Sequence, residues 1–141
     1  MKILVIGSGG REHAIVWKLK QSKSLPQIYC APGNGGISRD ARIVGIQSDD
    51  IKGLLDFAVK EKIDLTIVGP EAALAHGIVD RFMRKGLSIF GPTKELALLE
   101  SSKAYAKETM RRFNIPTAGF EIFDEVDKAI DFTNRPRLFA A

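Results

Sequence analysis

The stretch Lys2-Ile-Leu-Val-Ile-Gly-Ser-Gly-Gly-Arg-Glu-His13 decides the fold class. The run at residues 2–6 is short, mostly apolar and rich in β-branched side chains, which predicts a strand buried on both faces. Glycines follow at positions 7, 9 and 10, and a helical stretch then runs from about residue 11 to residue 21. A glycine-rich turn between a buried strand and a helix is typical of ligand-binding parallel sheets.

The same alternation of strand and helix continues as far as residue 92. Further strands are expected at residues 27–31, 43–46, 64–68 and 87–90. One helix is expected to begin at Asp49 or Asp50, and another to carry Leu74, Ile78 and Phe82 on one face. The sequence therefore predicts an α/β fold, a Rossmann-like parallel sheet with helices on both faces. Trp17 is expected to pack the first helix onto this sheet.

Three of the predicted strands end in segments rich in glycine and proline, at residues 7–10, 32–36 and 69–71. The carboxyl ends of parallel strands meet at one edge of the sheet, where such folds bind ligands. We therefore expect a single binding face at this edge.

The first glycine loop predicts a site for a phosphate or a carboxylate, because a helix N-terminus offers free amides and a positive dipole end. The alternative is a tight turn that serves packing alone. Arg11, Glu12 and His13 follow the loop, and the residues leave open whether they contact a ligand or are solvated residues of the first helical turn.

A dinucleotide site is disfavoured by two features. Glu12 stands where the third glycine of a G-x-G-x-x-G motif would fall, and the second strand runs into Ala31-Pro32 without the acid that binds the ribose. The Gly-Lys-Ser/Thr triplet of a Walker-type phosphate loop is also absent from the sequence.

From Thr93 onward the pattern changes to successive helical segments, with a cap expected at Ser101 or Ser102. A strand is expected at residues 117–123 and a last helix at residues 126–133. These changes predict two domains, residues 1–100 and residues 101–141.

Composition excludes several classes of function. The net charge is +4 and the basic residues are scattered, so no nucleic-acid partner is expected. The single cysteine, Cys30, lies in an apolar run and is expected to be buried, and no metal-binding Cys/His spacing occurs. No apolar run is long enough for a signal peptide or a membrane span, so a soluble cytoplasmic protein without a membrane partner is expected.

Several motifs resemble those of the phosphoribosylamine–glycine ligases when they are read in order. They are Gly7–Ala14, Ala31-Pro32-Gly33-Asn34, Asp64–Glu71 with Gly77-Ile78-Val79-Asp80, Phe90–Thr93, Ser102-Lys103-Ala104 with Lys107, and Ile115-Pro116-Thr117. The resemblance covers residues 1–134. It implies that residues 1–100 form the Rossmann-like, pre-ATP-grasp, substrate-binding domain and that residues 101–141 begin an ATP-grasp domain.

The resemblance also implies an activity. This family of purine (IMP) biosynthesis joins the substrates phosphoribosylamine and glycine, cleaves ATP, requires Mg²⁺ or Mn²⁺, and forms a glycyl phosphate. The implied substrate-binding residues are Gly9, Gly10, Arg11, Glu12, His13, Pro32, Gly33, Asn34, Gly69, Pro70 and Glu71. Lys103 is the implied ATP-binding residue. No catalytic residue and no metal ligand is assigned within the chain.

The resemblance ends after Asn134, before the family's nucleotide-binding lysine strand, its glycine-rich loop and its metal-binding residues. We therefore expect an incomplete ATP-grasp segment, a fragment that is inactive alone, and the missing remainder of the enzyme as a partner. Two other functions stay open: a non-catalytic module that docks with a separate remainder, and a dinucleotide-binding oxidoreductase domain.

Overall fold

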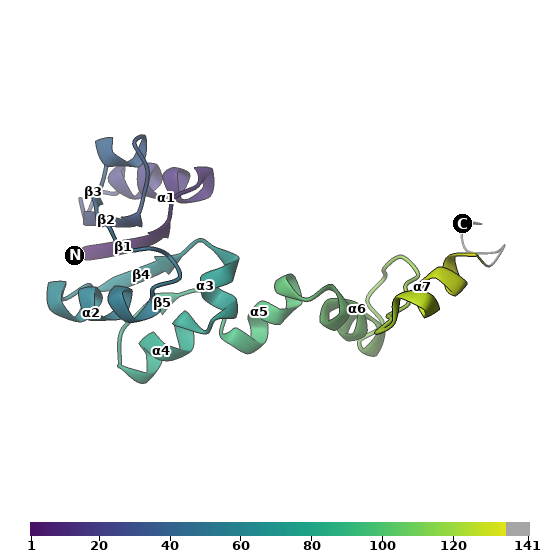
Figure 1. Cartoon of the computed structure of the whole chain (residues 1–141). Coiled ribbons are helices and arrows are strands. Elements are labelled where there is room, and N and C mark those ends of the chain that lie inside the picture. The colour runs from purple at the N-terminus through teal and green to yellow at the C-terminus, as the bar shows by residue number, and fades with distance from the viewer. Residues whose placement is uncertain (135–141) are drawn as a thin grey trace. The chain divides into compact units, whose positions relative to one another are not determined.

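A computed structural model describes residues 1–134, and the chain divides into two compact units, Met1–Ser101 and Ser102–Ala141. The first unit is built on a five-stranded sheet with the order β3-β2-β1-β4-β5. Every adjacent pair of strands is parallel. Helices cover both faces of this sheet (Figure 1), as the sequence predicted.

The strands are short and the helices between them are of one to three turns. The strands are β1 (Lys2–Gly7), β2 (Gln27–Pro32), β3 (Arg42–Ile43), β4 (Leu65–Val68) and β5 (Ile89–Phe90). The helices of the first unit are α1 (Gly10–Lys20), the 3-10 turn η1 (Ile37–Arg39), α2 (Ile51–Glu61), α3 (Glu71–Ala75), α4 (Ile78–Arg84) and α5 (Lys94–Ser101). The second unit contains α6 (Lys103–Arg112) and α7 (Val126–Thr133).

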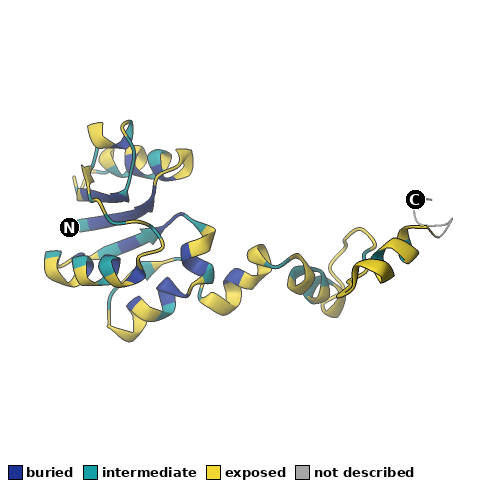
Figure 2. Cartoon of the chain, viewed as in Figure 1, coloured by how far each residue is buried: buried dark blue, intermediate teal, exposed yellow. Residues whose placement is uncertain are grey.

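The central strand β1 is buried on both faces because successive side chains alternate across a sheet. Ile3 and Val5 pack on the face that α1 and η1 cover, with Val16 among their neighbours. Leu4 and Ile6 belong to the core on the other face, which α2, α3 and α4 cover. The buried strands stand out in dark blue in Figure 2. The continuous apolar run at the start of the chain therefore predicted its environment correctly.

The predicted start of one helix is confirmed, and a glycine follows the end of another. Asp50 caps α2, since its carboxylate accepts a 2.9 Å hydrogen bond from the Gly53 amide. Gly86 follows the end of α4 with a φ of +69°, a left-handed conformation that glycine adopts without strain.

Two predictions for the first unit are wrong. Trp17 does not pack α1 onto the sheet, because its side chain is 56% exposed, and Val16 fills that role. The single helix expected around Leu74, Ile78 and Phe82 is divided into α3 and α4 at Gly77, which has a φ of +77°. All three apolar residues are nevertheless buried, so the periodicity located the core face and missed the break.

The second unit has no strand among its described residues, so the strand expected at residues 117–123 is wrong. A β-strand needs a partner strand for its hydrogen bonds, and residues 102–134 contain none.

The start of α6 was predicted at Ser101 or Ser102, and the structure shows Ser102 as the cap. Its hydroxyl accepts a 3.2 Å hydrogen bond from the Tyr105 amide. Lys107 donates to Thr117 Oγ1 at 2.6 Å and ties the following loop to α6. Residues 135–141, which follow the end of the sequence resemblance, lie outside the described part.

None of the helices within residues 1–134 is both long enough and apolar enough to cross a membrane.

Cys30 is fully buried in β2, as predicted, and this burial gives a pH-dependent prediction. Burial, and secondarily the charge of Glu12, raise the pKa of the Cys30 thiol from 9.0 to about 11. The folded state therefore favours the neutral thiol, so this contribution to stability is present below pH 9.0 and is lost as the pH rises to about 11. Urea unfolding across this range should show a steeper loss of stability in the wild type than in Cys30→Ala. Identical pH profiles would contradict the shift.

Candidate functional site

The three loops rich in glycine and proline meet at the carboxyl edge of the sheet, as the topology predicted. The Gly33 amide donates to the Gly7 carbonyl at 3.1 Å. The side-chain amide of Asn34 donates to the Ser8 carbonyl at 2.7 Å. On the other side, Arg11 Nη1 donates to the Gly69 carbonyl at 2.9 Å. The loops after β2 and β4 are therefore both fastened to the loop after β1.

The crevice at this edge lies where the order of the strands reverses. The chain passes from β1 to β2 and β3 on one side, and returns to pair β4 with the other side of β1. Such a switch point opens a crevice above the strand ends. A hollow of about 390 Å³ occupies this place and is lined by Gly7, Ser8, Gly9, Gly10, Arg11, Glu12, Ser48, Gly69 and Pro70.

Glu12 is buried beneath this hollow, with only 6% of its surface exposed. Its Oε2 accepts a 2.6 Å hydrogen bond from the Gly9 amide. A Cβ on Gly7 would lie 2.6 Å from Glu12 Cδ, and a Cβ on Gly69 would lie 2.5 Å from it. The two glycines thus leave the space that the carboxylate fills. This burial excludes the interpretation of Glu12 as a solvated residue of the first helical turn.

The carboxylate of Glu12 changes which groups can bind an anion. It accepts the hydrogen bond of the Gly9 amide, so this amide is not available to a ligand, and its negative charge offsets part of the positive end of the α1 dipole. Among the described residues, the amides of Gly10 and Arg11 have no hydrogen-bond acceptor. Both residues line the hollow, so their amides are two backbone donors that a ligand there could use.

The Arg11 guanidinium adds a fixed positive charge beside these amides. Its Nη1 is held by the Gly69 carbonyl, and its Nη2 lies 3.7 Å from Glu71 Oε1. The side chain is still 62% exposed, so donors remain available to a ligand. An arginine held by neutral and acidic partners at the rim of a hollow is suited to binding a phosphate or a carboxylate.

Asn34 fastens its own loop and lies outside the hollow. Its Oδ1 accepts hydrogen bonds from the amides of Gly36 at 2.8 Å and Ile37 at 2.9 Å, in addition to the bond that it donates to Ser8. His13 lies next to this turn, because a Cβ on Gly36 would be 2.7 Å from His13 Cε1. The predicted set therefore divides. Gly9, Gly10, Arg11, Glu12, Gly69 and Pro70 line the hollow, whereas His13, Pro32, Gly33, Asn34 and Glu71 do not.

Three residues that line the hollow were missing from the predicted set. Gly7 and Ser8 belong to the glycine loop that the sequence indicated, but they were not named among the substrate-binding residues. Ser48 comes from the segment between β3 and α2. The carboxyl end of the third predicted strand leads to the same edge of the sheet, and this signal could have found Ser48.

Lys103 is the first residue of α6 and its side chain is exposed. It belongs to the second unit, whereas the residues of the crevice belong to the first. Across residues 1–134, no three side chains of His, Cys, Asp or Glu are grouped so that they could hold a metal ion.

A parallel sheet of this order, with a glycine loop at its switch point, defines the class of Rossmann-like ligand-binding α/β domains. The family is narrower still. The chain belongs to the phosphoribosylglycinamide synthetase N-domain family, whose profile matches residues 1–100.

Similar proteins carry consistent names. A phosphoribosylamine–glycine ligase of Caldanaerobacter subterraneus is 54% identical over 132 residues, which are 94% of this chain and 32% of that protein. One of Escherichia coli O6:H1 is 52% identical over 134 residues, which are 94% of this chain and 31% of that protein. The chain thus spans about a third of the length of these relatives.

Solved structures agree on the fold. A crystal structure of phosphoribosylamine–glycine ligase from Thermotoga maritima matches with a TM-score of 0.69 and 28% identity, over 94% of this chain and 30% of that one. A biotin carboxylase domain from Hydrogenobacter thermophilus matches with a TM-score of 0.70 and 20% identity, over 94% of this chain and 32% of that one. The second likeness concerns the fold alone.

Proposed function

We propose that this chain supplies the sugar-phosphate site of a phosphoribosylamine–glycine ligase, an ATP-dependent carbon–nitrogen ligase of purine biosynthesis. The observation that supports this most directly is the convergence of the Gly10 amide, the Arg11 amide and the Arg11 guanidinium on one hollow. Those donors suit the 5-phosphate of phosphoribosylamine. The family and the names of the relatives supply the reaction.

In this proposal the residues of the crevice bind and orient the sugar phosphate. Glu12 holds the Gly9 amide and keeps the loop in the shape that presents the Gly10 and Arg11 amides. Asn34 fixes the loop after β2 against Ser8, and Arg11 fastens the loop after β4. A ligand whose phosphate is immobilised in this way presents its amine in a defined position, which lowers the entropic cost of the reaction.

The proposal also includes ATP and glycine as substrates. When bound, ATP with Mg²⁺ or Mn²⁺ would supply the phosphoryl group that activates the carboxylate of glycine for attack by the amine. We propose that residues 101–141 begin an ATP-grasp domain and that Lys103 contacts nucleotide phosphates there. Among residues 1–134, no three His, Cys, Asp or Glu side chains are grouped so that they could hold the metal ion.

An oxidoreductase role is less well supported. The end of β2, Ala31-Pro32, carries no acidic side chain to bind a ribose hydroxyl, and Glu12 fills the space below the glycine loop. The match to the phosphoribosylglycinamide synthetase N-domain family also favours a ligase over an oxidoreductase.

Arg11→Gln tests the proposed site. The variant should bind ribose 5-phosphate about tenfold more weakly than the wild type in calorimetric titrations, because a charge-assisted contact to phosphate is lost. The matched control is Lys18→Gln, which removes the same charge from an exposed position of α1. Equal affinities for the wild type and Arg11→Gln would contradict the assignment.

A further inference from the structure

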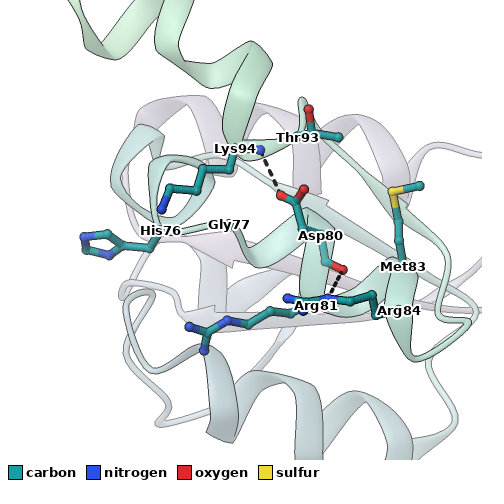
Figure 3. A pocket seen from close by; sticks show the side chains of 8 residues that line it. All are labelled: His76, Gly77, Asp80, Arg81, Met83, Arg84, Thr93 and Lys94. Atoms are coloured by element: carbon teal, nitrogen blue, oxygen red, sulfur yellow. Dashed lines mark hydrogen bonds between the residues drawn. The ribbon is translucent and has the colours of Figure 1, made fainter.

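A second hollow, larger than the crevice, lies on the first unit between α4 and the start of α5 (Figure 3). Its volume is about 590 Å³, within the range of small-molecule sites. The residues that line it are His76, Gly77, Asp80, Arg81, Met83, Arg84, Thr93 and Lys94. None of them lines the crevice.

The walls of this hollow are held in place by the fold. Ile78, Val79 and Phe82 anchor α4 in the core and are at most 2% exposed. Asp80 Oδ2 accepts a 2.8 Å hydrogen bond from the Lys94 amide, which fixes the start of α5 beside α4, as the dashed line in Figure 3 shows. The shape of the hollow therefore exists before any ligand binds.

The charges that line the hollow are mostly positive. Arg81, Arg84 and Lys94 all reach it, and none of the three forms an ion pair within residues 1–134. Arg84 Nε is engaged only by the Asp80 carbonyl, at 3.2 Å. Asp80 is the acidic residue of the lining, and its carboxylate already receives the Lys94 amide. A concave surface with excess positive charge attracts anions.

The kinds of side chain define the ligand further. Arginine presents a planar fork of donors that matches a phosphate group, and lysine adds a mobile point charge. Thr93 contributes a hydroxyl, and the exposed thioether of Met83 gives an apolar edge. The cations are gathered in one hollow and do not form the stripe that a nucleic-acid backbone requires.

From this geometry we infer that the hollow between α4 and α5 is a second anion site, which takes a small molecule bearing a phosphate or diphosphate group. The site is separate from the crevice and does not depend on the function proposed for it. A ligand here would bridge α4 and the first turn of α5, and would stabilise the contact between them.

Amide-resolved NMR of the full chain, titrated with inorganic pyrophosphate, tests this inference. Saturable shifts are expected at Gly77, Arg81, Arg84 and Lys94. The double variant Arg81→Gln/Arg84→Gln should weaken this binding by at least about tenfold. A control with the same loss of charge, Lys18→Gln/Lys23→Gln, changes exposed positions away from the hollow and should leave the affinity unchanged.

Several outcomes would overturn the site. Shifts confined to the crevice residues Gly10 and Arg11, or an equal loss in both double variants, would show that the hollow binds no phosphate specifically. A response to an acidic peptide without one to pyrophosphate would assign the surface to a protein partner instead. The amide shifts of the crevice and of the second hollow are read separately. A crevice that fails to bind ribose 5-phosphate would therefore not affect the test of pyrophosphate binding in the hollow. Parallel titrations with ribose 5-phosphate and with ATP would separate a sugar phosphate from a nucleotide.

Discussion

Gly69→Ala should destabilise the first unit by roughly 2–5 kcal/mol, by overpacking and by weakening the bond between Glu12 and Gly9. The added Cβ would meet the buried carboxyl group of Glu12, whose Cδ would be 2.5 Å away. Gly69 is itself buried, and its amide is bonded to the Ile6 carbonyl at 3.0 Å, so the backbone has little freedom to retreat. Urea unfolding followed by circular dichroism measures the change.

Gly35→Ala is the matched control for this substitution. A Cβ at Gly35 would have no atom within 4 Å, the residue is exposed, and its φ is not positive. We expect its stability to stay within about 0.5 kcal/mol of the wild type. Similar midpoints for the two alanine variants would mean that Glu12 does not occupy the space next to Gly69.

Glu12→Ala is the second substitution with a large expected effect. It removes the acceptor of the Gly9 amide and leaves a void beneath the loop, at a cost of about 2–4 kcal/mol. The glycine loop should also lose its shape, so that ribose 5-phosphate binding disappears in the same calorimetric assay. Glu12→Gln keeps the volume and one acceptor oxygen, and should retain more of both properties.

The control for Glu12 is a second glutamate at the same edge. Glu71 is about half exposed, and its pairing with Arg11 at 3.7 Å is a surface interaction worth about 0–1 kcal/mol. Glu71→Ala should therefore leave the unfolding midpoint nearly unchanged. If Glu71→Ala destabilised the protein as much as Glu12→Ala, the special position of Glu12 would be refuted.

The fold of the first unit could be predicted from the sequence because its signals are local. Continuous apolar runs located the strands, and the glycines at positions 7, 9 and 10 located the first ligand loop. Their meeting at one edge followed from the parallel topology, since all strand ends of such a sheet point the same way. The exposure of Trp17 and the break at Gly77 depend on tertiary packing, which periodicity does not encode.

The candidate site was predicted only in part for the same reason. The sequence indicated Glu12 as one of three polar residues at a helix start, and only the structure shows its carboxylate buried between Gly7, Gly9 and Gly69. The resemblance implied that Asn34 binds substrate, and nothing in the sequence indicated that its hydrogen bonds fasten two loops together. Such roles depend on which atoms approach after folding. The strand expected at residues 117–123 failed because strand propensity does not supply a partner strand.

A crystal structure of the chain with ribose 5-phosphate tests the central claim most directly. The proposal predicts the phosphate in the hollow at the ends of β1 and β4, bonded to the amides of Gly10 and Arg11 and to the Arg11 guanidinium. The Gly9 amide should still donate its hydrogen bond to the Glu12 carboxylate. A phosphate bound away from these groups, or a crevice that stays empty at saturating ligand, would contradict the assignment of this edge as the sugar-phosphate site.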